Sequence, residues 1–241
     1  MPKHLSPKQW LRENIEACFP AQCLLCRQPS HRQRELCTGC EADLPWLGAR
    51  CRQCAIPLPI GSDLSRCGLC LKKPPAYQRC LCPLRYEFPA NRLITGFKHQ
   101  RRISAGKLLA SLWLEACFDD LDGTMPDFIV PVPLHWWRQW RRGFNQSEYL
   151  AAQWSRALGI RHLNAVKRQR ATPAQQGLSA KDRRRNLRHA FAVSNPAAIT
   201  GKHIALVDDV LTTGATAHSV AAILARNGAT LVDIWCLART P

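Results

Sequence analysis

The chain has 241 residues, of which 46% are apolar and 21% are charged. This composition is typical of a packed globular protein, and the length suffices for one large domain or for a medium domain with a smaller one. No run of about 18 or more apolar residues exists, which argues against a membrane span. The first residues lack the apolar segment and the cleavage site of a secretory signal, so we expect a cytoplasmic protein.

The formal net charge is +17, and it is spread unevenly along the chain. Residues 128–202 hold 14 Lys and Arg against two acids, Glu148 and Asp182, so this window carries +12. Such a density of cations repels itself unless an anion neutralises it. Phosphate is the natural anion, either in a nucleic acid or in a phosphorylated small molecule. A solvated surface that only keeps the protein soluble is the alternative.

The chain opens with a short predicted helix and continues with closely spaced cysteines. Ser6 at the N-cap, Pro7 at the first helical position and Gln9 three residues after the cap indicate the helix. Eight of the 13 cysteines form four pairs with two residues between the members. These pairs are Cys23 and Cys26, Cys37 and Cys40, Cys51 and Cys54, and Cys67 and Cys70.

Four such pairs predict two zinc sites, because disulfides do not persist in the cytoplasm and tetrahedral thiolate sites select zinc. An iron–sulfur cluster or a redox pair is the alternative, although no βαβ pattern surrounds the cysteines. We favour sequential pairing, first pair with second and third with fourth, over a cross-braced arrangement with the same spacings. Neither site has an open position, so both are expected to be structural and to supply on the order of 10 kcal/mol of folding free energy. Most of the other cysteines are expected to be buried, with Cys80 and Cys82 as a candidate for a weak additional site.

The segment "KKPPAYQR", residues 72–79, has the composition of a linker. We therefore place a domain boundary there, with a small zinc-ribbon module in residues 1–75 and a second domain in residues 76–241. The zinc-ribbon module has too few apolar residues to fold without its metal ions.

Strands and helices alternate in the second domain. "RYEFPANRLITGFKHQRR" predicts a strand and a short helix, and residues 107–119 predict a longer helix. Residues 127–133 predict a short strand with prolines that a central ladder position does not tolerate. A helix over 147–159 is expected to end at Gly159. "HIALVDDV", "GATAHSVAAILARNG" and "TLVDIWCLA" then predict strand, helix and strand, so the domain is expected to be α/β with a parallel sheet.

Two adjacent aspartates, Asp208 and Asp209, end an apolar strand at the place where parallel sheets bind ligands. One carboxylate can turn towards a ligand and the other towards a neighbouring loop or a metal. The next residues lead into a helix N-terminus, whose amide and hydroxyl groups form an anion cradle. They are Thr212, Thr213, Gly214, Ala215 and Thr216. Carboxylates for hydroxyl groups beside an anion cradle predict a sugar phosphate, and no P-loop or dinucleotide-binding motif is present.

Two polar blocks rich in arginine precede this strand. Arg142, Asn145 and Gln146 follow a strand end, where their side chains suit either the binding of pyrophosphate or the positioning of a helix. Residues 168–193 lack periodicity, which fits a mobile lid or a nucleic-acid-binding face. Residues 136–142 interleave three tryptophans with three arginines, as in surfaces that stack on unpaired bases, or pack at an interdomain contact. The histidines show no recognisable partner and are assigned no catalytic role.

"IALVDDVLTTGAT", residues 204–216, closely resembles the phosphoribosyl pyrophosphate (PRPP) motif of type I phosphoribosyltransferases. The resemblance implies a parallel sheet flanked by helices, with Asp208 and Asp209 at the ribose hydroxyls and residues 212–216 around the 5-phosphate. It also implies that Mg²⁺ arrives with the pyrophosphate. Ala205 is smaller than the branched residue usual in the motif, and Thr212 stands where salvage enzymes for 6-oxopurines carry Asp.

The cysteine-rich N-terminus, "LITGFKHQRR", residues 130–151 and residues 168–193 resemble, in this order, the blocks of the ComF family. The resemblance implies a role in bacterial DNA uptake, either in natural competence or in the use of external DNA as a nutrient. Implied ligands and partners are PRPP, single-stranded DNA, and an ATP-driven DNA translocase or a protein that handles single strands. Candidates for contact with pyrophosphate or nucleic acid, some of them in a lid, are Lys98, Arg141, Arg142, Asn145, Gln146, Arg168, Arg170, Gln175, Arg183 and Asn186.

Two other functions stay open on the sequence. An active phosphoribosyltransferase of nucleotide salvage needs a base pocket but neither a zinc module nor a basic window. A zinc-ribbon adaptor that senses PRPP without catalysis would bind the same ligands as a ComF-type protein and would differ from it only in its chemistry. No general base is identifiable, so transfer activity is not assigned.

Overall fold

The computed structural model describes residues 21–59, 61, 64–121, 123, 125–134, 143–169 and 190–241. The chain divides into two compact units, residues 1–44 and 45–241, and each is described by itself. This division lies upstream of the segment 72–79, where the sequence suggests a linker. The helix expected from Ser6 onwards lies outside the described residues.

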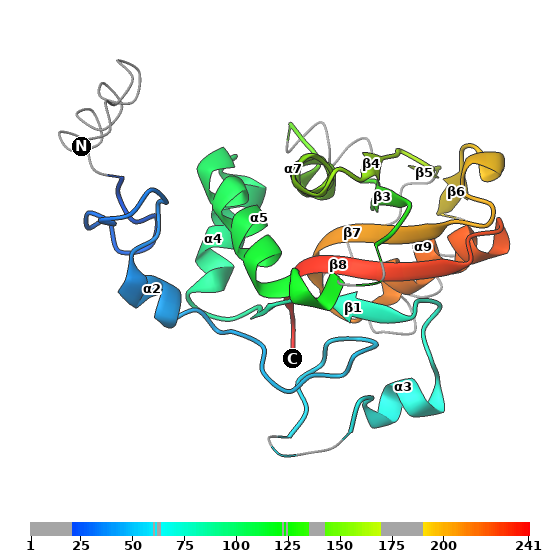
Figure 1. Ribbon diagram of the computed structural model, residues 1–241, viewed down its shortest axis with the longest axis horizontal. Helices are drawn as coiled ribbons and strands as arrows, with labels where there is room; N and C mark the ends of the chain where they lie inside the picture. Colours follow the sequence, from blue (N-terminus) through cyan, green and yellow to red (C-terminus); the bar gives the residue numbers. More distant parts are fainter. Residues whose placement is uncertain are drawn as a thin grey trace, which may run out of the picture. The chain divides into compact units, whose positions relative to one another are not determined.

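A parallel sheet forms the centre of the second unit (Figure 1). Its described strands run in the order β1–β8–β7–β3–β4, with β2 also beside β8, and all of these pairs are parallel. The parallel α/β prediction is therefore confirmed. The strands are β1 (Arg79–Leu81), β2 (Leu84–Arg85), β3 (Phe128–Pro131), β4 (Arg161–His162), β7 (His203–Leu211) and β8 (Leu231–Arg239). A separate antiparallel pair consists of β5 (Val166–Arg168) and β6 (Phe191–Val193).

The helices predicted from hydrophobic spacing are present with small changes at their ends. Gly159 adopts a φ of 69° directly after α7, and Gly228 adopts a φ of 95° after α9, as expected of residues that terminate helices. The longer helices are α4 (Ala90–His99), α5 (Ile103–Cys117), α7 (Gln146–Leu158) and α9 (Ala215–Arg226). Short helical turns are α2 (Thr38–Ala42), α3 (Gly68–Lys72), η1 (Asp119–Leu121) and η2 (Pro196–Ala198).

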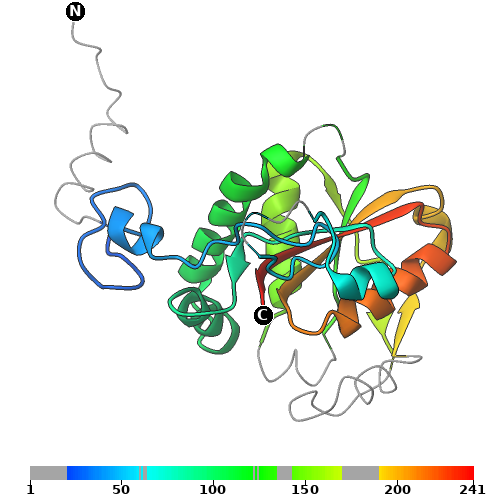
Figure 2. The ribbon, with the colours of Figure 1, turned by 90° about the horizontal axis from the view of Figure 1, so that it is seen from below.

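The two faces of the sheet are covered by different helices (Figure 2). On one face, Trp113 of α5 and Trp154 of α7 pack against Trp235 of β8. The ring centroid of Trp113 lies 4.2 Å from that of Trp154 and 4.8 Å from that of Trp235. Ile234 and Cys236 flank Trp235, so their side chains point to the opposite face, where they share a core cluster with α9. Both faces of β7 and β8 are thus buried, which explains their near-continuous apolar runs.

Strand β3 lies inside the sheet, between β7 and β4. The prolines of residues 127–133 had indicated that this strand would not occupy a central position. Pro131 is the last residue of β3, and the next N–H, that of Val132, donates to Val207 of β7 at 2.9 Å. The nitrogen of Pro131, which carries no hydrogen, therefore faces the other neighbour, β4. The pairing of β3 with β4 has already ended at Ile129. The expectation was wrong because no acceptor lies opposite the proline.

The second cysteine-rich segment is part of the second unit. Leu47, Ala55 and Tyr77 are buried in the same core cluster as α9. The N–H of Cys80 in β1 donates to the carbonyl of Arg52 at 2.9 Å, and the Gln53 side chain donates to the Tyr77 carbonyl at 3.0 Å. The segment around Tyr77 is therefore packed against the sheet.

Within the described residues, no helix combines the length and the apolar character needed to cross a membrane.

Candidate functional site

The two cysteine-rich segments fold alike. In each, the N–H of the first cysteine donates to the carbonyl five residues later, and its carbonyl accepts from the N–H four residues later. The residue at that fourth position, Arg27 or Ala55, has a positive φ of 68° or 56°. A short helix then starts directly after the third cysteine, with Cys37 before α2 and Cys67 before α3. The chain therefore contains two copies of one zinc-ribbon unit, as the spacing predicts.

The cysteine sulfurs converge into two groups of four. Within each group they all lie within 4.8 Å of one another, in the sequential arrangement. Four cysteine ligands at this spacing fit a tetrahedral structural Zn²⁺, which binds thiolates. Burial raises the pKa of Cys51, but backbone N–H groups, that of Cys67 foremost, lower this pKa more, to about 7. The groups are Cys23, Cys26, Cys37 and Cys40, and Cys51, Cys54, Cys67 and Cys70.

The remaining described cysteines are buried in the core. Cys80 and Cys236 lie on neighbouring strands with their sulfurs 3.7 Å apart, and Cys82 and Cys117 are fully buried. Within the described residues, no third group of metal-binding side chains includes Cys80 or Cys82. These cysteines therefore act as small apolar residues.

The loop between β7 and α9, residues 212–216, has the geometry of an anion cradle. Gly214 is the N-cap of α9 and adopts the left-handed conformation, with a φ of 72°. Thr212 and Thr213 are exposed, and the Thr213 hydroxyl accepts a hydrogen bond from the N–H of Ala215 at 3.4 Å. The first turn of α9 has N–H groups without helical partners and the positive end of the helix dipole, which together attract an anion.

The two carboxylates before this loop take different partners. Asp209 forms a 2.9 Å ion pair with Lys98 of α4, and the two side chains are only 14% and 16% exposed. Asp208 accepts from the N–H of Asp209 at 2.9 Å and from the Ser147 hydroxyl at 3.4 Å. Burial and the neighbouring Asp209 carboxylate raise the pKa of Asp208 to about 8, against the lowering effect of Lys98. Asp209 is thus ion-paired with Lys98, whereas the buried Asp208 carboxyl group is protonated more readily than an ordinary aspartate.

Several candidate residues from the sequence have structural partners. Asn145 caps α7 by accepting from the N–H of Ser147 and donates to the Val132 carbonyl at 3.1 Å, which is the helix-positioning role. Gln146 is 1% exposed and donates to the Lys98 carbonyl at 3.3 Å. Arg168 lies over the Phe191 ring at 5.4 Å. The candidates outside the described residues are Arg141, Arg142, Arg170, Gln175, Arg183 and Asn186, together with the tryptophans of residues 136–140.

Three side chains at this site had no signal in the sequence analysis. Arg239 donates to the carbonyl of Leu211 at 3.0 Å, His218 accepts from the N–H of Ala76 at 3.0 Å, and Tyr77 lies against Gly214. Each residue looks ordinary in sequence because its partner is a backbone group in a distant segment.

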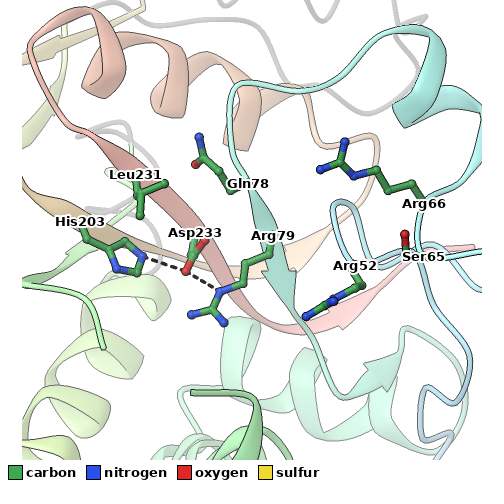
Figure 3. Close-up of a pocket in the computed structure, with 8 residues that line it drawn as sticks. All are labelled: Arg52, Ser65, Arg66, Gln78, Arg79, His203, Leu231 and Asp233. Atoms are coloured by element: carbon green, nitrogen blue, oxygen red, sulfur yellow. Dashed lines mark hydrogen bonds and ion pairs between the residues drawn. The ribbon is translucent and has the colours of Figure 1, made fainter. Parts of the chain in front are cut away.

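A second candidate site is a basic pocket of about 310 Å³ at the amino ends of β1, β7 and β8 (Figure 3). At its base, the buried Asp233 carboxylate accepts from Arg79 at 2.6 Å and lies 2.8 Å from His203. Arg52 and Arg66 of the second ribbon also line the pocket and are exposed. Among the described residues, neither of these two arginines forms an ion pair. Their positive charge is therefore available to an anionic ligand.

Substitution of the two zinc groups has different expected consequences. Cys23→Ser with Cys26→Ser removes one of two zinc ions per chain and leaves the thermal unfolding of residues 45–241 unchanged. Cys51→Ser with Cys54→Ser also removes one ion but lowers the unfolding temperature of the sheet unit, because Leu47 and Ala55 belong to its core. Zinc released per chain and calorimetric unfolding test this. Equal stability of the two variants would contradict the shared core.

The raised pKa of Asp208 predicts a pH dependence of stability. Between its ordinary value of 3.8 and about 8, the unfolded chain releases this proton while the folded chain keeps it. Asp208 therefore disfavours folding increasingly as the pH rises through this range, and Asp208→Asn removes the effect. Urea unfolding of both proteins at pH 5, 6.5 and 8 is expected to show a gain in the relative stability of the variant. Parallel pH profiles would contradict the assignment.

Comparison with known proteins identifies both parts of the chain. Residues 14–71 match the family model of the double zinc ribbon domain, and residues 140–241 match that of the phosphoribosyl transferase domain. Among solved structures, a purine phosphoribosyltransferase from Pyrococcus horikoshii covers 66% of this chain and 77% of its own, with 19% identity and a TM-score of 0.34. The fold assignment rests on the strand order and the family match, not on that weak similarity.

Three curated relatives align along nearly the whole chain. DNA utilization protein YhgH of Escherichia coli K12 is 41% identical over 226 residues, and that of Salmonella typhi is 40% identical over 228 residues. Competence protein F of Haemophilus influenzae is 38% identical over 228 residues. Each alignment covers 92% of this chain and 98% of the relative. With two zinc ribbons ahead of a phosphoribosyltransferase domain, the chain belongs to the ComF family of DNA utilization and competence proteins.

Proposed function

We propose that this protein binds PRPP at the β7–α9 loop and single-stranded DNA on its basic surface, and acts in the cytoplasm on incoming DNA. The observation that carries the PRPP assignment is the succession of Asp208, Asp209 and a Gly214-capped helix at the carboxyl edge of a parallel sheet. This edge is where parallel α/β sheets take their ligands. The order of groups along it matches the order of hydroxyls and phosphate in a ribose 5-phosphate.

Each part of the loop has a distinct chemical task in this proposal. The Asp209 carboxylate, paired with Lys98, and the Asp208 carboxyl group accept hydrogen bonds from the ribose hydroxyls. The N–H groups of the first turn of α9 and the Thr213 hydroxyl donate to the 5-phosphate. Lys98 contributes a positive charge towards the pyrophosphate. Mg²⁺ would accompany the pyrophosphate and neutralise part of its charge, bound by oxygen ligands as such a hard cation prefers.

Two observations support nucleic-acid binding by the same chain. The net charge is +17, with +12 of it between residues 128 and 202. The basic pocket presents Arg52 and Arg66 (Figure 3). It is lined by His203 and Leu231, the first residues of β7 and β8, whereas the β7–α9 loop follows the carboxyl end of β7. A phosphodiester chain suits such a pocket because arginine forks match phosphate oxygens. The binding partners expected in the cell are an ATP-driven DNA translocase or a protein that handles single strands.

The proposal does not include a transfer reaction. Within the described residues around the β7–α9 loop, the ionisable side chains include Asp208, Asp209, Lys98, Tyr77, His218 and Arg239. Lys98 is paired with Asp209, Asp208 accepts from the Ser147 hydroxyl, and His218 accepts a backbone N–H at its Nδ1. Two alternative functions compete with this proposal. One is that of a phosphoribosyltransferase acting on a nucleic acid or a free base, and the other is that of a zinc-ribbon adaptor that only senses PRPP.

Calorimetric titration with PRPP and Mg²⁺, with and without a short single-stranded oligonucleotide, tests the PRPP assignment. Wild-type protein is expected to bind, and Asp208→Asn with Asp209→Asn is expected to lose at least tenfold in PRPP affinity while its oligonucleotide affinity is unchanged. Asp127→Asn is the control, because Asp127 pairs with Lys202 far from the loop. Release of pyrophosphate only in the presence of DNA would favour the transferase function. Undiminished PRPP binding by the double variant would contradict the proposed site.

The basic pocket predicts a salt-dependent change in DNA affinity. Arg52→Gln with Arg66→Gln is expected to weaken oligonucleotide binding and to reduce the slope of log affinity against log salt concentration by roughly 1.4, since each contact with single-stranded phosphate contributes about 0.7. Arg92→Gln with Arg226→Gln removes the same charge at exposed positions outside the pocket. Fluorescence anisotropy at several salt concentrations measures both. Equal losses in the two double variants would show that net charge alone is responsible.

A further inference from the structure

The second zinc ribbon contacts the β7–α9 loop through Arg239, at the end of β8. Its Nε donates to the carbonyl of Cys54 at 3.0 Å, and another guanidinium nitrogen donates to the carbonyl of Leu211 at 3.0 Å and to that of Thr212. Arg239 is 8% exposed. One rigid planar group therefore joins the backbone of a zinc ligand to the backbone where the loop begins.

Tyr77 makes a second contact beneath the loop. Its side chain is 2% exposed, and its hydroxyl oxygen lies so near Gly214 that a Cβ at residue 214 would be 3.2 Å away. The Tyr77 carbonyl accepts from the side chain of Gln53 at 3.0 Å. Gln53 is itself 5% exposed and stands between Cys51 and Cys54 in the sequence. The cysteine turn thus supports the residue that packs on the N-cap of α9.

The third contact reaches the first turn of α9. Nδ1 of His218 accepts from the N–H of Ala76 at 3.0 Å, and the N–H of His218 donates to the carbonyl of Gly214 at 2.8 Å. Because Nδ1 is the acceptor, the neutral ring carries its proton on Nε2. The segment that follows the second ribbon therefore holds both ends of the first turn of the helix.

We propose that Arg239, Tyr77 and His218 are positioning residues that make the metal of the second ribbon part of the PRPP site. Thr212 and Thr213 are exposed, so the loop is held mainly from its inner side. The carbonyl of Cys54 keeps its direction only while the cysteine turn is closed around zinc. Loss of that zinc releases an acceptor of Arg239 and loosens the loop. By linkage, a ligand bound at the loop retains zinc in the second site.

The identity of the loop ligand rests on the proposed function, but the positioning role does not. Arg239→Lys keeps the positive charge and removes the fork that spans two carbonyls, and Tyr77→Phe removes only a hydroxyl. Arg85→Lys is the matched control, because Arg85 pairs with Arg239 in the sheet and is exposed. Hydrogen exchange of residues 211–218 in zinc-loaded, ligand-free protein is the first readout.

Arg239→Lys and Tyr77→Phe are expected to retain two zinc ions and to exchange the loop amides several-fold faster than Arg85→Lys. The PRPP affinity of Arg239→Lys is expected to fall about tenfold, as for the loss of one charged hydrogen bond. Unchanged loop exchange in folded Arg239→Lys would overturn the positioning role. Faster loop exchange in Arg239→Lys and Tyr77→Phe but not in Arg85→Lys, with no PRPP binding by any protein, wild type included, would support the positioning role and contradict the proposed ligand.

Linkage is tested in the variant Cys23→Ser with Cys26→Ser, whose remaining zinc is in the second ribbon. PRPP with Mg²⁺ is expected to slow the release of this zinc to a chelator several-fold, and Arg239→Lys is expected to abolish the slowing. The control is the variant Cys51→Ser with Cys54→Ser, in which only the first zinc site remains. PRPP is expected not to affect the release of zinc from that site. PRPP that binds without slowing release from the second site would overturn the linkage.

Discussion

A buried parallel strand that carries two adjacent carboxylates near its carboxyl end is the constraint on which the rest of the structure depends. The sequence suggested that the strand ends in these aspartates, but β7 continues beside β8 as far as Leu211. β7 is paired on both sides, and residues 204–207 are fully covered on both faces. Asp208 and Asp209 lie just beyond the end of β3 while β7 is still paired with β8, so these little-exposed carboxyl groups need partners. Lys98 pairs with Asp209, and burial together with the Asp209 carboxylate raises the pKa of Asp208. The chain then turns at Gly214 into α9, and this sequence of groups creates the candidate PRPP site.

The zinc ribbons serve this arrangement in different ways. The second ribbon buries a small cluster around Cys51, Cys67 and Cys70, and it also places Ala55, Leu47 and the adjoining Tyr77 in the core beside α9. Its zinc therefore stabilises part of the sheet unit as well as itself. The first ribbon belongs to the other compact unit. Two copies of one local fold thus have separate structural settings, which is the basis for expecting different effects when their ligands are replaced.

Local pattern predicted the elements and the site, while long-range contacts escaped it. Apolar runs predicted β7 and β8, and glycines predicted the ends of α7 and α9. The cysteine spacing predicted the two sulfur groups. The prolines of β3 led to a wrong prediction because a local pattern does not reveal that the neighbouring strand, β4, pairs with β3 only as far as Ile129. Tyr77 lies in a segment with the composition of a linker, and the carbonyl partner of Arg239 is 185 residues away, so neither has a local signal.

The central claim is that the β7–α9 loop binds the phosphate of PRPP and that the adjacent aspartates bind its ribose. A crystal structure of the protein with PRPP and Mg²⁺ tests this most directly. The account predicts the 5-phosphate at the N–H groups of residues 213–216 and the ribose hydroxyls within hydrogen-bond distance of Asp208 and Asp209. A loop without ligand at saturating PRPP, or PRPP bound in the basic pocket instead, would contradict it.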